Sequence, residues 1–271
     1  MRITFNFKND GPTGSRRALP LVSVAAAFAA TLAAAPARAD RRAYATTYEA
    51  VTAPKGELDV EMWSTYARDG EVLDGPPSKG FRNMLELEYG LTDRWDMALY
   101  NLLDTTSASE DTGYAGAKLE TRYRLLPAGS WLLDPIIYFE FQLLRHGDAR
   151  EKLESKLILA RDQGPWNVAF NLAAEAEHLV TSDWIPETEY ALGVSRELAG
   201  PAVKLGLEIF GKAEKPPRQD VQFFAWTGPA LSWATRFDAA MHGIWATVGA
   251  GRGLTSSSET WYGRLVVGLQ F

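Results

Sequence analysis

One short stretch of the chain carries residue types that could support hydrolysis. His178 is followed closely by Thr181, Ser182 and Asp183. A hydroxyl nucleophile becomes reactive when a base such as histidine lies within hydrogen-bond reach and a third group orients that base. The order of residues after His178 fits no His-x-Ser pattern, so the stretch is a weak candidate for such chemistry.

The other histidines give weaker signals. His146 and Asp148 enclose a glycine, which is typical of a polar turn, and His242 is expected in the middle of a strand as an interior or packing residue. The chain has no Cys, which excludes disulfides and thiolate metal sites. The acids Glu110 and Asp111 are expected to be solvated in a loop. The sequence therefore predicts no catalytic, metal or cofactor site, and no enzyme.

Composition excludes a further class of function. The 271-residue chain has a net charge of -6. Nucleic-acid binding needs a basic surface that neutralises phosphates. We therefore expect no nucleic-acid partner.

The first 39 residues have the composition of a secretory signal peptide. Arg16 and Arg17 precede an alanine-rich apolar run at 18–35, and an A-x-A cleavage site stands at 37–39. The run is only weakly apolar and contains polar residues and a proline, which favours cleavage over a retained membrane anchor. We expect residues 1–39 to be removed during export through the secretory pathway.

Beyond residue 40 the dominant pattern is strict alternation of polar and apolar residues. In the stretch 117–125 the polar set is Lys118, Glu120, Arg122 and Arg124. Successive side chains of a strand point to opposite faces, so period 2 indicates strands with one polar and one apolar face. Segments of about ten residues suit tilted membrane-spanning strands. Twelve are expected, near 57–68, 82–90, 94–103, 114–126, 131–144, 151–161, 166–179, 186–198, 202–212, 221–234, 237–251 and 260–271.

The expected connections alternate strictly between short and long. Outer-membrane barrels have short periplasmic turns and longer outside loops, so this rhythm predicts that both termini of the chain lie on the periplasmic side. Short links are predicted at 91–93, 127–130, 162–165, 199–201 and the corner 235–236, and longer ones at 69–80, 104–113, 145–150, 180–188, 213–220 and 251–259. Interfacial aromatic girdles are predicted at Trp95, Trp131, Trp166, Trp184 and Trp261, which stand near segment ends.

One architecture lets these strands place their apolar faces against lipid and their polar faces in an interior. A strand crosses hydrocarbon only when every backbone donor and acceptor is paired, and a closed barrel is the only sheet without an edge. We therefore predict an all-β fold, an antiparallel up-and-down transmembrane β-barrel of about 12 strands over residues 57–271. Its last strand should pair with its first, with Phe271 toward lipid and Arg264 inside.

The closing stretch GRLVVGLQF resembles the C-terminal signature of bacterial outer-membrane β-barrel proteins, in which alternating apolar residues end in Phe. The resemblance implies that Phe271, Leu269 and Val267 form the signal read by the barrel-assembly machinery. The stretches 48–63, 86–100 and 227–233 are similar to poorly characterised transporter-like outer-membrane barrels of the phenol-degradation-pathway type. That similarity implies passage of small organic molecules.

The faces expected to point into the barrel are dense in charge. The lumen-lining candidates are Arg82, Glu86, Glu88, Lys118, Glu120, Arg122, Glu140, Lys152, Glu154, Lys156, Glu175, Lys204, Glu208 and Arg264. They could line a water-filled channel and tune its selectivity. They could equally form ion pairs that plug a lumen of only moderate width. Residues 40–56, before the first strand, would either fold into this lumen or lie in the periplasm.

Together these features favour a protein of the Gram-negative outer membrane that gives passive passage to small solutes. The expected partners are outer-membrane lipid, the barrel-assembly machinery and an unidentified solute, with no cofactor. Two alternatives stay open at this point. One is an outer-membrane lipid-modifying hydrolase in which His178 acts as a base, and the other is a plugged structural barrel without transport.

Overall fold

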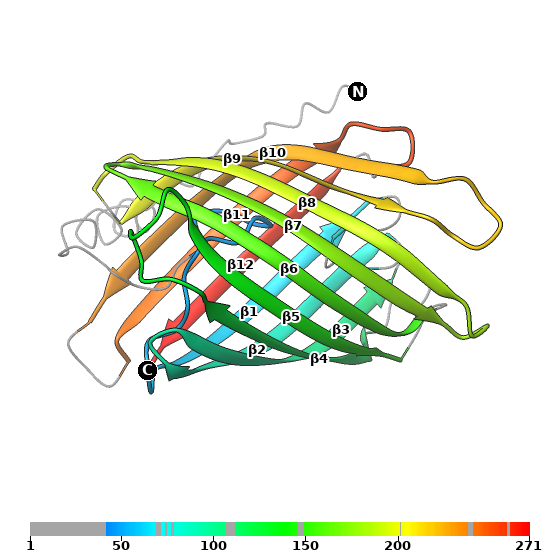
Figure 1. Ribbon diagram of the computed structural model, residues 1–271, viewed down its shortest axis with the longest axis horizontal. Coiled ribbons are helices and arrows are strands. Elements are labelled where there is room, and N and C mark those ends of the chain that lie inside the picture. Colours follow the sequence, from blue (N-terminus) through cyan, green and yellow to red (C-terminus); the bar gives the residue numbers. More distant parts are fainter. Residues whose placement is uncertain are drawn as a thin grey trace, which may run out of the picture. The chain divides into compact units, whose positions relative to one another are not determined.

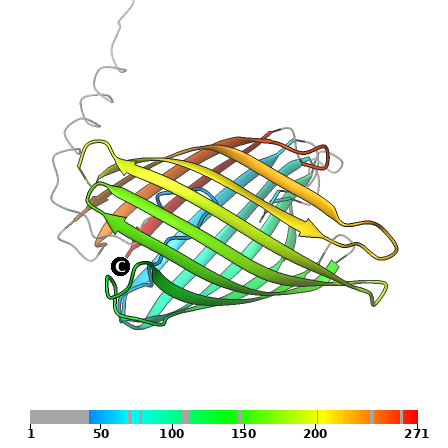
Figure 2. The ribbon, with the colours of Figure 1, turned by 45° about the horizontal axis from the view of Figure 1, so that its top comes forward.

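The computed structural model describes residues 42–68, 72–73, 75–76, 79–106, 112–145, 149–200, 202–237, 241–258 and 261–271. These residues form twelve strands, each antiparallel to its neighbours (Figures 1 and 2). The strands are β1 (Leu58–Ala67), β2 (Gly80–Thr92), β3 (Trp95–Thr106), β4 (Thr112–Arg124), β5 (Asp134–Leu144), β6 (Ala149–Gln163), β7 (Trp166–Leu179), β8 (Trp184–Glu197), β9 (Val203–Glu214), β10 (Gln222–Arg236), β11 (Gly243–Gly253) and β12 (Tyr262–Gln270).

The sheet closes on itself in sequence order, because β12 pairs with β1. Asp59 lies opposite Gln270 and Ala67 opposite Tyr262. Beyond the ladder, the backbone of Phe271 exchanges hydrogen bonds with Leu58 at 2.9 and 3.1 Å. A closed sheet leaves no unpaired edge. The predicted all-β, antiparallel up-and-down barrel of 12 strands is confirmed.

No helix among the described residues is long and apolar enough to cross a membrane.

Buried and exposed side chains alternate along the strands. In β12, Arg264 and Gln270 are buried while Leu265 is exposed, as the period of 2 predicts. The exposed set of the barrel is rich in Leu, Val, Phe and Tyr, with Phe139 55% exposed. The buried set includes many charged residues. This is the reverse of the distribution in a soluble protein, where large apolar surfaces are rare.

The five tryptophans predicted at strand ends are all exposed, between 42% and 62%. Trp95 and Trp166 begin β3 and β7, and Trp131 precedes β5, so these three lie at the end where odd-numbered strands begin. Trp184 begins β8 and Trp261 precedes β12, which places them at the opposite end. Aromatic residues at both rims are typical of barrels that span a membrane.

The predicted strict alternation of short and long connections is wrong. The connection 125–133 between β4 and β5 is longer than 145–148 and 180–183 at the other end of the barrel. The backbone N–H of Gly129 donates to Asp134 Oδ1 at 2.6 Å. This hydrogen bond helps to hold the nine-residue connection in a folded turn. The lengths of the predicted links did not indicate such a turn.

The corner predicted at 235–236 is also wrong. β10 continues through Arg236, and β11 begins only at Gly243. The backbone N–H of Phe237 donates to the carbonyl of His242 at 2.9 Å, which closes a loop between the strands. His242 is therefore an exposed loop residue and not the mid-strand interior residue that was predicted.

Candidate functional site

The inward faces of the strands carry the charged residues of the barrel. The structure places all the predicted lining residues on these faces. Buried are Arg82, Glu86, Glu88, Lys118, Glu120, Arg122, Glu140, Glu154, Lys156, Glu175, Glu208 and Arg264, while Lys152 and Lys204 are partly buried. Sequence reasoning missed Glu187 and Lys212, which are buried as well. Lys212 stands four residues after Glu208 on the same alternating face of β9, and this alternation was the signal that could have revealed it.

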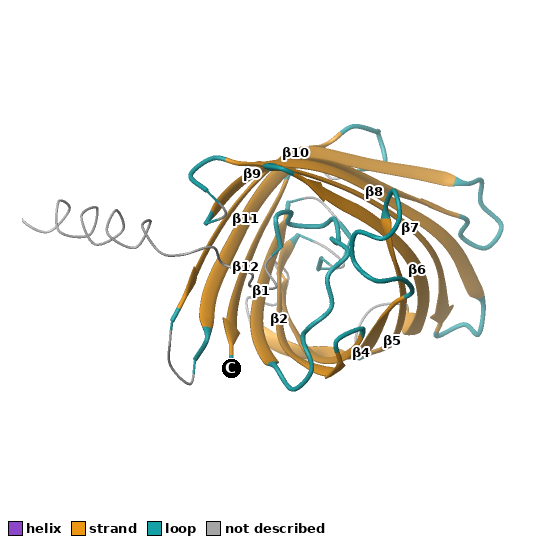
Figure 3. Ribbon diagram, turned by 60° about the vertical axis from the view of Figure 1, so that its left-hand side comes forward, coloured by secondary structure: helices purple, strands orange, loops and turns teal. Residues whose placement is uncertain are grey.

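The N-terminal segment, residues 42–56, enters the barrel before β1 begins. Residues 42–48 are buried, and Figure 3 shows this part of the chain inside the ring of strands. The sequence left its position open between lumen and periplasm, and the structure places it in the lumen. Arg41 and the predicted signal peptide, residues 1–39, lie outside the described residues.

A single carboxylate on the wall holds the backbone of the N-terminal segment. The N–H groups of Ala45, Thr46 and Thr47 donate to the two oxygens of Glu208 at 3.0–3.1 Å. The hydroxyl of Thr47 donates to the same carboxylate at 3.1 Å. Hydrogen bonds to a charged acceptor are stronger than neutral ones, and they satisfy donors that would otherwise be buried without partners.

Two asparagines of β7, which β8 separates from β9 and its Glu208, also hold the segment. Asn171 accepts from the N–H of Tyr48 at 2.7 Å and donates to its carbonyl at 2.9 Å. The hydroxyl of Tyr44 donates to Asn167 Oδ1 at 2.8 Å. Burial raises the pKa of the Tyr48 phenol to about 12 and raises the pKa of Tyr44 well above its ordinary value. Both phenols are therefore held in the neutral form.

Arg42 anchors the start of the described segment through its guanidinium group. That group lies 4.2 Å from the ring centre of Tyr48 and 4.3 Å from that of Trp63. Its Nε is 3.8 Å from Glu61 Oε2. Stacking of a guanidinium on aromatic faces is favourable where water is excluded. The segment is thus held by cation–π contacts as well as hydrogen bonds.

Part of the connection between β1 and β2 also folds inward. Val72 and Leu73 are buried against Phe210, Trp226 and Tyr262. This contact was not predicted. The two adjacent apolar residues within an otherwise polar connection were the signal that could have revealed it.

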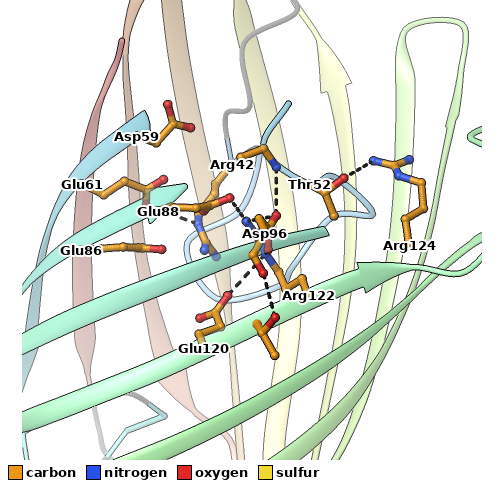
Figure 4. Close-up of polar contacts among 12 residues, drawn as sticks. Arg42, Thr52, Asp59, Glu61, Glu86, Glu88, Asp96, Glu120, Arg122 and Arg124 are labelled. Carbon is orange, nitrogen blue, oxygen red and sulfur yellow. Dashed lines mark hydrogen bonds and ion pairs between the residues drawn. The ribbon is translucent and has the colours of Figure 1, made fainter. Parts of the chain in front are cut away.

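Arg122 on β4 pairs with three carboxylates of the interior. Its Nε and Nη2 donate to the two oxygens of Asp96 at 3.1 and 3.0 Å. It also pairs with Glu88, and its Nε lies 3.5 Å from Glu120 Oε1 (Figure 4). Asp96 accepts a further hydrogen bond at 2.9 Å from the N–H of Ala53 in the N-terminal segment. A buried charge of this kind is tolerated only with such partners.

Two cavities that lie among the described interior residues are small. One of about 20 Å³ is lined by residues of β2 and β5–β9, including Glu154, Glu175 and Lys212, and another of about 20 Å³ lies beside Thr46 and Lys156. A volume of this size holds about one water molecule. A much larger hollow, about 490 Å³, is lined mainly by outward-facing apolar residues, so it belongs to the outer surface and not to the lumen.

The residues considered for hydrolysis are not assembled as a nucleophile and base. His178 Nδ1 lies 2.9 Å from Glu151 Oε1, and its ring stacks on Trp184 at 4.5 Å. Thr181 donates instead to Asp183 at 3.2 Å. His146 and Asp148, like Glu110 and Asp111, lie outside the described residues.

Comparison with solved structures gives the same fold at low sequence identity. An outer membrane channel from Pseudomonas putida F1 aligns with a TM-score of 0.52 and 15% identity over 82% of this chain and 97% of the other. The NanC porin aligns with a TM-score of 0.50 and 10% identity over 79% and 98%. No family model and no curated protein matches the sequence. The chain thus has the closed-barrel fold of bacterial outer-membrane barrels.

Proposed function

We propose that the chain is an outer-membrane channel that gives passive passage to small solutes through a charge-lined lumen. The observation that carries this proposal is the distribution of polarity, with apolar side chains exposed outside and charged ones buried inside. The two solved structures described above, named as an outer membrane channel and a porin, support it by analogy of fold.

The outer surface supports the membrane part of this proposal. Exposed leucines, valines and phenylalanines cover the barrel between the two levels of exposed tryptophan. Lipid is the partner that such a belt requires. Residues 1–39 would direct export, and Phe271, Leu269 and Val267 would be read by the barrel-assembly machinery.

The interior supports the channel part. A barrel that only needed to fill its core would do so with apolar side chains, because charges are costly to bury. Here the lumen is lined by rows of acids and bases, with water-sized cavities between them. Such a lining suits hydrated small solutes and would tune which of them pass.

A plugged barrel without transport is the second candidate, and the N-terminal segment favours it. Residues 42–48 are buried in the lumen and hydrogen-bonded to Glu208, Asn167 and Asn171. If the segment stays in the lumen and there is no continuous path beside it, the barrel is closed to solutes.

Conductance in planar bilayers separates these two candidates. Purified protein that migrates as a folded, heat-modifiable band from outer-membrane fractions would be added to both chambers. The channel predicts small discrete steps that increase in number with protein. A flat trace at high load of folded protein would contradict the channel and favour the plugged barrel. Recovery of the protein only in soluble fractions would contradict both.

A further inference from the structure

Carboxylates from neighbouring strands lie opposite one another in the barrel interior. Pairing places Glu120 opposite Glu140, Glu140 opposite Glu154, and Glu154 opposite Glu175. The same register continues in both directions. The complete set, here named the carboxylate row, is Asp59, Glu88, Glu120, Glu140, Glu154, Glu175, Glu187 and Glu214, with Ala98 as the one break between β2 and β4.

This row passes from one end of the barrel to the other. Strands of a barrel tilt by about 35–45°, so a line that follows the pairing from strand to strand also climbs along the axis. Asp59 is the second residue of β1, and Glu214 is the last residue of β9, which runs in the same direction. The row therefore begins near the end where β1 starts and finishes at the opposite end.

Cations lie on both sides of the row, each two residues along its strand from a row carboxylate and therefore at the next inward-facing position. Lys118 and Lys152 lie on one side, and Arg122, Lys156 and Lys212 on the other. Ion pairs join these cations to the carboxylate row, for example Lys118 Nζ to Glu140 at 3.0 Å, Lys156 Nζ to Glu154 at 2.8 Å and Lys212 Nζ to Glu187 at 3.1 Å. The carboxylates are thus partnered, which allows them to remain charged in a confined space.

The balance of charge is nevertheless acidic. The row holds eight carboxylates against five flanking cations. Among all described residues that are buried, thirteen are acidic and seven are basic. Like charges opposite one another on neighbouring strands are destabilising, so a mobile cation would be favoured beside them. A lumen of one dominant sign concentrates the counter-ion.

We infer that the lumen selects small inorganic cations over anions, and that the carboxylate row determines this selectivity. This inference rests on the proposed channel function. The cavity lined by Glu154, Glu175 and Lys212 opens beside the row and has room for about one water, which suits a small ion and not a bulky solute. Rings and rows of carboxylates provide cation selectivity in other channels by the same electrostatics.

The test is the reversal potential of the full mature protein in bilayers with a KCl gradient. The expected result is a potential of the sign set by K⁺, with a K⁺ permeability severalfold above that of Cl⁻. Conductance with equal permeabilities, or with preference for Cl⁻, overturns this inference and leaves the channel intact. Absence of conductance from folded protein overturns the channel and this inference together.

Variants assign the selectivity to the row. The double substitution Glu154→Gln with Glu175→Gln should lower the K⁺/Cl⁻ permeability ratio severalfold, while Lys156→Gln should raise it. Glu151→Gln is the matched control, because Glu151 lies on the same strand but on the outward face beside His178. Glutamine keeps the shape of glutamate and removes only its charge. If a variant fails to assemble, the reversal potential of the wild-type protein still tests the selectivity. An unchanged ratio in the double variant would overturn the role of the row.

Discussion

The ring of Tyr44 occupies the space in front of Gly193 on β8. A Cβ at Gly193 would stand 2.6 Å from Cε1 of Tyr44, closer than such atoms approach in proteins. A Cβ at Gly206 on β9 would also be tight against the same ring, at 3.1 Å from its Cδ1. The wall of the barrel is therefore shaped to receive the N-terminal segment, and glycine at position 193 is required by this approach.

Gly193→Ala should displace Tyr44 and loosen the N-terminal segment. The added methyl group overlaps the aromatic ring, and overpacking of this kind costs about 1–3 kcal/mol. We expect larger unit conductance in planar bilayers, with the barrel still heat-modifiable. Gly164→Ala is a useful comparison, since no atom lies within 4 Å of a Cβ there, although its φ of 59° makes alanine strained. Equal conductance for wild type and Gly193→Ala would argue that Tyr44 does not limit the pore.

Glu208→Ala should release the segment more completely. It removes the acceptor for three backbone N–H groups, and each buried donor left unpaired costs about 1–3 kcal/mol. The measurement is maleimide labelling of a cysteine introduced at Thr46, which is buried in the wild-type lumen. Labelling should be faster in the Glu208→Ala background than with Glu208 intact. Glu197→Ala on the neighbouring strand serves as the control, and equal rates in all three would contradict the prediction.

Arg122→Met should destabilise the barrel itself. Asp96, Glu88 and Glu120 would be left buried without the guanidinium that they share, and breaking a buried ion pair by removing one partner costs about 3–5 kcal/mol. The temperature at which the folded band converts to the unfolded one on gels should fall. Arg196→Met is the matched control, because Arg196 lies on the exposed face of β8. A fall of the same size in both variants would show that the pairing is not the cause.

Alkaline pH should weaken docking of the N-terminal segment. The pKa of Tyr48 is raised from 10.0 to about 12 by burial, so between these values the released segment loses a proton that the docked one retains. Docking is then unaffected below pH 10 and becomes weaker as pH rises toward about 12. Conductance should increase over this interval. Tyr48→Phe should reduce the increase and not abolish it, because the pKa of Tyr44 is raised in the same direction. A full increase in Tyr48→Phe would exclude Tyr48 as its origin.

Phe271→Ala should impair assembly in the outer membrane while export proceeds. Phe271 is exposed beside the first strand, where its backbone pairs with Leu58, so its side chain is available to the assembly machinery. The readout is the heat-modifiable fraction in outer membranes against the amount of processed protein. Leu254→Ala, in an exposed loop before β12, gives a control for loss of a comparable apolar side chain. Normal assembly of Phe271→Ala would contradict the proposed signal.

Local alternation was sufficient to predict the strands and, within them, the face on which the charged side chains lie. Successive side chains of a strand point to opposite faces. The polar residues of 117–125 and of 263–271 therefore indicate which face is inward even when the neighbouring strands are not known. The same rule failed at the ends of strands. The corner at 235–236 and the uniform loop rhythm were wrong because turn hydrogen bonds such as that of Phe237 with His242 do not follow a period.

The sequence by itself determined the fold class, the closure of the last strand on the first, and the acidic and basic character of the inward faces. Only the tertiary structure decided which charges meet and what fills the lumen. The carboxylate row depends on register across nine strands, and the docking of Tyr48 on Asn171 joins residues 123 positions apart. The N-terminal segment has no alternation of its own, so its place is set by complementarity with the wall, to which Gly193 and Glu208 contribute. Such non-local contacts leave no periodic trace in the sequence.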